Sequence, residues 1–548
     1  MRTITTWPRR PSRPWAWLCG RPWPRARGSC RLRARYCLRG ASPCIASGAG
    51  RSNTGNTHVG GGGGGPGSVV AVLAPLAASL PGAKTVELLV DREQELGLLE
   101  REYREPGFRL LVVYGRRRVG KTYLLRWFCR GRPCVYYVAA ELPYENLARE
   151  FSLAVRDTLG LPVAGDVVEV LEALVRLHRG GDKLVVVLDE FQYLVEADPS
   201  LPSRLMRSID TVLRGSEMVL VLCGSSVSFF EKRLLGYQAP LYGRRTGQLK
   251  LRPMMFWEAW GFNPGLTAVE AARLYGVAGG TPAYLALLGP SASAERLVEE
   301  ATRPGSPLLD EPVWLLRQEL REPRTYLAVL RAVAEGRVEP SEAAHAAGVD
   351  PRSIGRYIEV LEELDLVERV RPLGRRRPVQ LRFRDNFFRF WFSFILPLRS
   401  LIESGAVEKA RRVILEELDS YMGRAFEETI VPQLATRMID RGILPVEPRQ
   451  AGPWWHRGIE IDLVVRSPGK ATAFIEAKWA RLSVSDARRV LARLEEKAGE
   501  TGLASPRNYY VLVARELDEP ILEEHHIAVD LEWLHRHRVV EPAASKTV

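Results

Sequence analysis

Acidic residues are missing from the first part of this 548-residue chain, where no Asp or Glu precedes Glu87. The same stretch holds twelve Arg and Lys84, which together match the net charge of +13. The rest of the chain carries the other 65 of the 78 basic residues and all 65 acidic ones. Net charge therefore gives no argument that the folded part binds nucleic acid, and only a local basic patch could supply one.

Cysteine and long apolar runs are also scarce. Four of the 7 cysteines lie before residue 50, at spacings that do not match a zinc site. Cys129, Cys134 and Cys223 are too few for a disulfide framework, which favours a reducing, cytoplasmic location. No uninterrupted apolar run reaches the roughly 20 residues of a membrane-spanning helix, so no membrane association is expected. A hydrophobic content of 46% excludes a wholly disordered chain.

Residues 1–84 are rich in Arg, Pro, Trp, Gly and Ser and include six consecutive glycines from Gly60 to Gly65. Such a composition buries too little apolar surface to offset chain entropy, so a disordered basic segment is expected. Three interpretations are open: a tail that binds nucleic acid, a targeting peptide, or an upstream stretch included by the choice of start codon. The abrupt change of composition near Lys84 favours the third.

Residues 110–114, LLVVY, form a short apolar run that predicts a strand buried on both faces. The segment that follows, GRRRVGKT, has the spacing of a phosphate loop, and residues 121–130 continue as a predicted helix. Lys121 is expected to reach the β- and γ-phosphates and Thr122 to ligate Mg²⁺. The residues predicted to surround the nucleotide are Gly115, Arg116, Arg117, Arg118, Val119, Gly120, Lys121, Thr122 and Tyr123, together with Asp189.

Two further apolar runs end in polar residues. Residues 184–188 are followed by Asp189 and Glu190, a pattern typical of a strand whose first carboxylate holds Mg²⁺ and whose second polarises the attacking water. Residues 218–222 precede Ser225 and Ser226, of which Ser225 is the predicted contact to phosphate or water; a helix-capping serine is the alternative. Alternating strands and helices predict a parallel sheet with nucleotide at its carboxyl edge.

Arg244 and Arg245 follow in the segment PLYGRRTGQLKL. Either could stabilise the γ-phosphate in a transition state, often from a neighbouring subunit, which would imply a homo-oligomer. The alternative is a structural or solvated arginine pair.

The segments VDREQEL, GRRRVGKT, LVVVLDEFQYL, LCGSSVSFF, PLYGRRTGQLKL and GGTPAYL occur in an order that resembles archaeal-type AAA+ ATPases of the signal-transduction-like branch of P-loop NTPases. The resemblance covers about residues 86–480. It implies ATP rather than GTP as ligand, with Mg²⁺, and it matches Arg92 to the family's DRE motif. It assigns Lys121, Thr122 and Asp189 to nucleotide and metal binding and Glu190 to catalysis.

Residues 313–385 have the outline of a winged helix. A helix is predicted over 313–334, another starts at Pro340, and residues 351–364 place apolar side chains at helical spacing on one face. Strands at 366–371 and 379–383 flank a turn with three consecutive arginines. DNA binding through helix and wing is one interpretation, and packing against protein is the other. The aromatic run 387–398 is too short to span a bilayer and predicts a buried helix or a dimer contact.

The C-terminal part predicts a hairpin of strands 459–465 and 473–479, a helix over 484–498 and a strand over 508–514. A period of two puts Glu460, Asp462 and Val464 on one face and brings Glu476 beside Lys478. The Asp-x13-Glu-x-Lys pattern, with Glu427 upstream, resembles restriction-endonuclease-like nucleases. That resemblance implies metal ligation by Glu427, Asp462 and Glu476 and water activation by Lys478; solvated charged strands are the alternative.

The predicted fold class is α/β: a P-loop NTPase parallel sheet with a helical lid, then a winged helix and an α/β restriction-endonuclease-like domain. The expected boundaries are 1–84 for the basic segment, 85–235 for the ATPase core, 236–312 for the lid, 313–385 for the winged helix and 386–548 for the C-terminal domain. The expected function is Mg²⁺-dependent ATP hydrolysis coupled to DNA binding or cleavage. The alternative is an ATP-dependent switch that binds a partner without cutting.

Overall fold

The computed structural model describes residues 88–178, 181–320, 322–543 and 545–547. The predictions for the basic segment 1–84 lie outside the described residues. Within the described part, every helix is too short or too polar to cross a bilayer.

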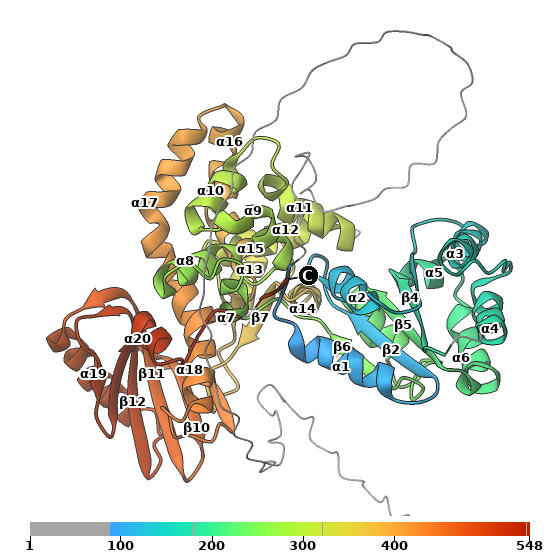
Figure 1. The fold of residues 1–548 in the computed structure, drawn as a ribbon. Coiled ribbons are helices and arrows are strands. Elements are labelled where there is room, and N and C mark those ends of the chain that lie inside the picture. The colour runs from blue at the N-terminus through green and yellow to red at the C-terminus, as the bar shows by residue number, and fades with distance from the viewer. Residues whose placement is uncertain (1–87, 179–180, 321, 544, 548) are drawn as a thin grey trace, which may run out of the picture. The chain divides into compact units, whose positions relative to one another are not determined.

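A five-stranded parallel sheet forms the first part of the described chain (Figure 1). Its order is β3-β4-β5-β2-β6, with bounds Arg109–Tyr114 for β2, Cys134–Val138 for β3, Leu184–Asp189 for β4, Met218–Gly224 for β5 and Gly247–Lys250 for β6. Every residue of β4 and β5 is buried, because these apolar runs lie in the middle of the sheet. The predicted α/β class and P-loop-type parallel sheet are confirmed.

Helices cover both faces of this sheet. Leu111 and Val113 pack with α1 (Glu93–Arg104) and α2 (Lys121–Cys129), whereas Leu110 and Val112 face the opposite cluster. The helices of that second face are α3 (Tyr144–Leu159), α4 (Val167–Leu177), α5 (Phe191–Ala197) and α6 (Leu201–Thr211). The alternation within β2 is the period of two expected of a strand buried on both sides.

A disulfide joins Cys129 at the end of α2 to Cys134 at the start of β3, with a Cα–Cα distance of 5.7 Å. Cys223 is free and buried in β5. Cysteine usage predicted reduced cysteines, and this bridge between two nearby residues differs from that expectation.

Helices make up most of the next part of the chain, and the first of them, η2 (Phe229–Leu234), still precedes β6 of the parallel sheet. They are η2, α7 (Phe256–Trp260), α8 (Ala268–Ala278), α9 (Pro282–Leu288), α10 (Ala294–Thr302) and α11 (Pro307–Glu319). The prediction of one helix over 313–334 is wrong, because α11 ends at Glu319 and α12 spans Pro323–Ala334. The proline ring disfavours helical geometry at Glu322, whose φ is −124° and ψ 72°.

The segment predicted as a winged helix continues with α13 (Pro340–Ala346), α14 (Ile354–Glu363) and the antiparallel pair β7 (Val367–Val370) and β8 (Gln380–Phe383). Ile354, Ile358 and Leu361 on α14 are buried, as their helical spacing predicted. This order of elements matches the expected outline, and the winged-helix assignment stays a prediction.

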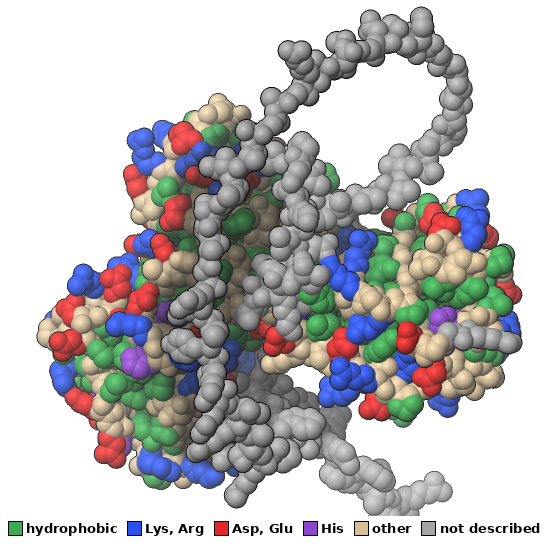
Figure 2. All heavy atoms as spheres, in the orientation of Figure 1, with side chains coloured by type: hydrophobic (Ala, Val, Ile, Leu, Met, Phe, Trp, Pro, Cys, Tyr) green, Lys and Arg blue, Asp and Glu red, His purple; other side chains and the backbone are tan. Residues whose placement is uncertain are grey.

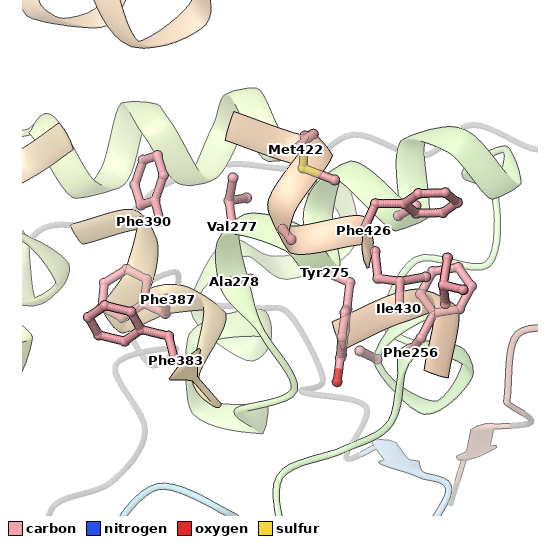
Figure 3. Packing of buried hydrophobic residues seen from close by; sticks show 14 of the residues in the cluster. Phe256, Tyr275, Val277, Ala278, Phe383, Phe387, Phe390, Met422, Phe426 and Ile430 are labelled. Carbon is pink, nitrogen blue, oxygen red and sulfur yellow. The ribbon is translucent and has the colours of Figure 1, made fainter. Parts of the chain in front are cut away.

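The aromatic run folds into α15 (Asn386–Phe390) and η4 (Trp391–Ile395), followed by α16 (Leu396–Glu403), α17 (Val407–Ala425), η5 (Phe426–Ile430) and α18 (Val431–Asp440). Phe387, Phe388 and Trp391 are fully buried, so the buried-helix interpretation is confirmed. Figure 3 shows Val277 and Ala278 of α8 between the α15 phenylalanines and the side chains of Met422 and Phe426.

A second sheet, with both parallel and antiparallel strands, forms in the C-terminal part of the chain, and its strand order is β13-β14-β12-β11-β10-β9. Its strands are β9 (Gln450–His456), β10 (Ile459–Ser467), β11 (Ala471–Leu482), β12 (Arg507–Leu517), β13 (Ile521–Leu522) and β14 (His526–Asp530). β11, β12 and β14 run parallel, and α19 (Val484–Gly499) connects the first two and packs on them (Figure 1). The predicted hairpin, helix and strand, and the separate C-terminal α/β part, are confirmed.

Short strands at the ends of the described chain pair with each other: β1 (Leu88–Val90) runs antiparallel to β15 (Ser545–Thr547). α20 (Leu531–Arg536) precedes β15 and packs against α8 and β12. On the face seen in Figure 2, basic and acidic side chains of the described residues are interspersed, in line with their equal numbers from Glu87 onward.

Candidate functional site

The predicted phosphate loop bends tightly between β2 and α2. Gly115 has a φ of +155°, and a Cβ there would lie 2.2 Å from the Leu251 carbonyl oxygen, so the bend requires glycine. Lys121 turns back into the bend, where its Nζ donates to the carbonyl oxygens of Gly115 at 2.7 Å and Arg116 at 3.0 Å. The ammonium group is thus held inside the loop by weak neutral acceptors that a phosphate oxygen can replace.

Asp189, at the carboxyl end of β4, accepts hydrogen bonds from hydroxyl and amide donors. Its Oδ2 accepts from the Thr122 hydroxyl at 2.9 Å and from the Tyr136 hydroxyl at 2.7 Å, and its Oδ1 accepts from the Glu190 amide at 2.9 Å. Burial, followed by the neighbouring Asp189 charge, raises the pKa of Tyr136. A hydroxyl and a carboxylate in contact at the end of the loop are ligands that fit Mg²⁺, which keeps several waters beside one or two such groups.

The ends of β4 and β5 meet at Glu190. Its Oε2 accepts from the Ser225 hydroxyl at 2.9 Å, from the Ser225 amide at 3.2 Å and from the Gln192 side-chain amide. Glu190 has a φ of +52°, which turns the chain out of the strand into α5. The structure therefore brings together Glu190 and Ser225, which the sequence singled out separately. Sequence reasoning missed Gln192, whose only signal is its place two residues after Glu190.

A large cavity opens beside these residues. Its volume is about 1260 Å³, and Gln192, Ser225, Arg117 and Glu319 are among the residues that line it. The exposed ring of Tyr237 also lies on its wall. The cavity is large enough for a nucleotide and reaches Arg117 of the loop and the two side chains, Gln192 and Ser225, that contact Glu190.

The three arginines of the loop contact acidic groups far along the chain. Arg116 is fully buried; it donates to the Thr281 hydroxyl at 2.5 Å and forms an ion pair with Asp385, the N-cap residue of α15. Burial lowers the pKa of Arg116, and the Asp385 charge more than offsets this, so the net direction is upward. Nη2 of Arg116 is thus held by Thr281 and Asp385, whereas its Nε and Nη1 are buried without a hydrogen-bond partner among the described residues.

The other two loop arginines pair with α11. Arg118 contacts Glu311 at 2.6 Å, and Arg117 contacts Glu319 at 3.0 Å. Burial raises the pKa of both carboxyl groups, and the arginine partners partly offset this rise. Sequence analysis assigned these arginines to the nucleotide and did not find their acidic partners, because nothing in the local pattern marks contacts across so many residues.

Arg92 of the DRE motif supports the loop from behind. Its guanidinium donates to the carbonyl oxygen of Arg252 at 2.7 Å and to that of Val119 at 3.4 Å, and it pairs with Glu95 at 2.8 Å. The side chain is 6% exposed. It therefore positions the loop backbone.

Arg244 and Arg245 lie apart from the contacts described above. Arg244 forms an ion pair with Asp210 of α6 at 2.8 Å and donates to the carbonyl oxygen of Pro240 at 3.2 Å. The Arg245 guanidinium lies over the ring of Tyr242 at 5.6 Å from its centroid. A role of either arginine toward the phosphate of another subunit stays a prediction.

The C-terminal acidic residues meet where the β10–β11 ladder ends. Asp462 Oδ2 accepts from the Ala477 amide at 2.8 Å, and Lys478 Nζ contacts Glu476 Oε1 at 2.8 Å. Lys497 of α19, which sequence analysis missed, contacts Glu476 at 3.2 Å. Asp462, Glu476 and Lys478 are thus neighbours, with the lysines beside the carboxylates.

A β-bulge changes which side chains of β10 share a face. The register of β9 against β10 shifts between Ile461 and Val464. Val464 therefore packs with Ile461 and Phe474 in one apolar cluster. The prediction that Val464 shares the face of Glu460 and Asp462 is wrong, because the extra residue of the bulge reverses the alternation.

Glu427 of η5 belongs to the same acidic group. Burial, and then the charge of Asp462, raises the pKa of Glu427 to about 8. Burial, and then the charge of Glu476, raises the pKa of Asp462 to about 6. Among the described residues, no three acidic, histidine or cysteine side chains are arranged to hold a metal ion. Metal ligation by Glu427, Asp462 and Glu476 stays a prediction.

The predicted DNA-reading elements contact other parts of the protein. Glu363 at the end of α14 pairs with Lys232 of η2 at 2.6 Å. In the predicted wing, the Leu373 amide donates to the Pro453 carbonyl oxygen of β9 at 2.8 Å, and Arg375 contacts His456 at 3.0 Å. These contacts favour the interpretation in which helix and wing pack against protein.

Two family models match the chain. One, described as an ATPase domain predominantly from Archaea, matches residues 89–288; the other, DUF234, described as archaeal and bacterial proteins of unknown function, matches residues 391–490. The first match covers the phosphate loop, β4 and the helices through α9. The second runs from η4 into α19 and includes the C-terminal acidic residues.

Individual proteins are similar over longer stretches. The uncharacterized protein MJECL04 of Methanocaldococcus jannaschii is 31% identical over 435 residues, which cover 79% of this chain and 96% of that protein. A solved Walker-type ATPase of Pyrococcus abyssi is 20% identical and covers 56% of this chain and 96% of its own, with a TM-score of 0.43. The Aeropyrum pernix ORC2 protein, solved as ADPNP and ADP complexes, is 16% identical, covers 59% and 96%, and has a TM-score of 0.38.

Proposed function

This chain belongs to the family of archaeal ATPases that join an ATPase domain to a DUF234 domain, and we propose that it hydrolyses ATP with Mg²⁺ at the carboxyl edge of the parallel sheet. The observation that carries the proposal is the contact of Thr122 with Asp189, beside a lysine whose ammonium group lies inside the loop. These groups supply a metal ligand pair, formed by the start of α2 and the end of β4, and a phosphate-binding cation inside the loop. We keep 85–235, 236–312, 313–385 and 386–548 as the proposed domains.

Each residue of the site has a defined task in this proposal. Lys121 exchanges its two carbonyl acceptors for phosphate oxygens, and the loop amides of residues 115–123 bind the remaining oxygens. Thr122 and Asp189 would hold Mg²⁺, which supplies neutralisation of the phosphate charge. Glu190 accepts a hydrogen bond from the attacking water and orients it, while Ser225 and Gln192 hold the carboxylate in place.

Substitution of Glu190 tests this assignment. We expect Glu190→Gln to bind ATP with the affinity of the parent and to hydrolyse it about a hundredfold more slowly, because the amide orients water poorly. Lys121→Ala is expected to lose ATP binding. The matched control is Glu145→Gln, an exposed glutamate of α3. Parent-rate hydrolysis by Glu190→Gln, measured as phosphate release at saturating ATP, would show that another group orients the water.

A regulatory switch is the second candidate, and specific contacts favour it over DNA binding by the predicted winged helix. The wing lies on β9 and α14 pairs with η2, so the parts predicted to reach DNA contact the rest of the chain. In this candidate function, ATP binding changes the oligomeric state of the protein or its contacts with a partner. Arg244 or Arg245 could then contact the nucleotide of a neighbouring subunit in a cytoplasmic homo-oligomer.

Plasmid nicking separates the two candidates. The parent protein is incubated with supercoiled and linear DNA and Mg²⁺ or Mn²⁺, with and without ATP. Under the nuclease version, Asp462→Asn and Lys478→Met each abolish cutting, because the carboxylate and the ammonium group would act on the same phosphodiester. Intact ATP binding without nicking supports the switch, and equal cutting by both variants removes the C-terminal site.

A further inference from the structure

A second cavity lies between the predicted winged helix and the helices that follow it. Its volume is about 310 Å³, at the lower end of the range of small-molecule sites. Residues of α12, β8, α15, η4, α17 and η5 form its wall. One part of that wall is apolar, with Val333, Leu381 and Phe394, and the rest carries charged side chains and hydroxyls.

Arg389 is the buried cation of this cavity. Its side chain is 4% exposed; Nη2 donates to the Phe383 carbonyl oxygen at 3.0 Å and to Glu428. Its Nη1 is buried and has no hydrogen-bond partner among the described residues. A buried N–H without an acceptor is costly, and other atoms of Arg389 line the cavity, so an acceptor that enters the cavity can satisfy Nη1 once the guanidinium group turns toward it.

Other donors line the same cavity. Glu428 is shared between Arg389 and Arg382, whose Nε lies 3.6 Å from it, so one carboxylate faces two guanidinium groups. Arg424 has neither an ion pair nor a hydrogen bond to any described residue. The hydroxyls of Ser393 and Ser420 have no side-chain hydrogen bond in the described chain either. Three guanidinium groups and the two carboxylates of Glu417 and Glu428 line the cavity, and the half-buried Glu368, opposite Arg382 in the β7–β8 ladder, adds a third carboxylate outside the lining.

We propose that this cavity binds the phosphate group of a small phosphorylated molecule with an apolar body. A tetrahedral phosphate presents several acceptor oxygens, which suits Arg389 Nη1, the Arg424 guanidinium and the two serine hydroxyls better than a planar carboxylate does. The apolar wall next to these donors takes the uncharged part of the ligand. The site is separate from the phosphate loop and does not depend on ATP hydrolysis.

The test uses the full chain with Lys121→Ala, so that the phosphate loop does not contribute. Inorganic phosphate, phenyl phosphate and benzoate are titrated by calorimetry at constant ionic strength. We expect phenyl phosphate to bind at least tenfold more tightly than inorganic phosphate, and benzoate not to bind. A folded protein that binds neither phosphate compound, or that binds benzoate as well as phenyl phosphate, overturns the proposal.

Substitutions locate the bound molecule. Arg424→Gln is expected to weaken phenyl phosphate binding at least tenfold, and Arg424→Lys to restore part of it. The matched control is Arg412→Gln, an exposed arginine on the same helix outside the cavity lining. Arg389→Met tests the buried donor, and Arg424→Gln keeps the test decisive if that variant does not fold. Equal binding by the Arg424 and Arg412 variants overturns the proposal.

Discussion

At the scale of single residues, the phosphate loop and the C-terminal acidic residues differ in the groups that surround their charged side chains. In the phosphate loop, Lys121 and Asp189 are surrounded by neutral partners, the carbonyl oxygens of Gly115 and Arg116 and the hydroxyls of Thr122 and Tyr136. In the C-terminal part, buried carboxylates act on one another, and the pKa of Glu427 and Asp462 rises. The first site is arranged to receive a phosphate and a cation, and in the second the carboxyl group of Glu427 keeps its proton at neutral pH.

The raised pKa of Glu427 predicts a pH dependence of stability. The folded state keeps the proton up to about pH 8, whereas the unfolded chain releases it near pH 4.5. The folded state therefore binds more protons between these values, and the free energy of unfolding falls as pH rises through this window. Gln cannot ionise, so Glu427→Gln does not lose stability in this window. The free energy of unfolding of Glu427→Gln minus that of the parent should therefore be higher at pH 9 than at pH 5, by about 2 kcal/mol or more.

Urea unfolding at both pH values measures this difference. Glu416→Gln, an exposed glutamate of α17, is the matched control and should change little between the two pH values. If the parent and Glu427→Gln differ by the same amount at pH 5 and pH 9, the carboxyl group is ionised in the folded protein at both.

At the scale of elements, α15 is the short helix that joins the phosphate loop to the C-terminal helices. Asp385 caps it by accepting from the Phe388 amide at 2.8 Å and also pairs with Arg116 of the loop. On the same helix, Arg389 pairs with Glu428 of η5. One helix of five residues thus connects the loop with the segment matched by the second family model.

Removal of one partner of the Arg116–Asp385 pair should be costly. Asp385→Asn keeps the size of the side chain but leaves the buried Arg116 charge unpaired, which we expect to destabilise the protein by about 3–5 kcal/mol. Arg116→Met combined with Asp385→Asn should recover part of that loss, because neither charge is then buried alone. Denaturant unfolding of the two single variants and the double variant measures the coupling. Strict additivity would show that the two groups do not interact.

At the scale of the whole described chain, the proposed ATP site is linked to helices outside the ATPase match at 89–288. The loop arginines contact α11 and α15 through Glu311, Glu319 and Asp385. A ligand that orders the loop should therefore change the stability of these helices, since binding energy is shared through direct contacts.

Amide hydrogen exchange checks this linkage. We expect a non-hydrolysable ATP analogue to slow exchange in α11 and α15 of the parent, and Arg118→Gln to reduce the effect in α11, because Arg118 contacts Glu311. Arg156→Gln, an exposed arginine of α3 whose partner is the adjacent Asp157, is the control. Slowing confined to the loop and α2 would mean that these ion pairs do not transmit binding.

Local sequence patterns were sufficient to predict most of the helices and strands. The strands at 110–114, 184–188 and 218–222 are contiguous apolar runs because both faces of the parallel sheet are covered, and such runs are readable without partners. The hairpin around Pro468 and Gly469 was found in the same way. The prediction of a single helix over 313–334 is wrong at Pro323. Apolar side chains keep their helical spacing across this residue, but proline disfavours the continuation of a regular helix.

The sequence by itself determined the phosphate loop, the acidic strand end and the α/β class, because each rests on residues adjacent in the chain. Only the tertiary structure decided that Arg116 pairs with Asp385, that the bulge in β10 turns Val464 away from Asp462, and that Arg389, beside a cavity, keeps a buried donor without a partner among the described residues. The physical reason is separation: Arg116 and Asp385 are 269 residues apart, and burial selects such partners only once the chain is packed.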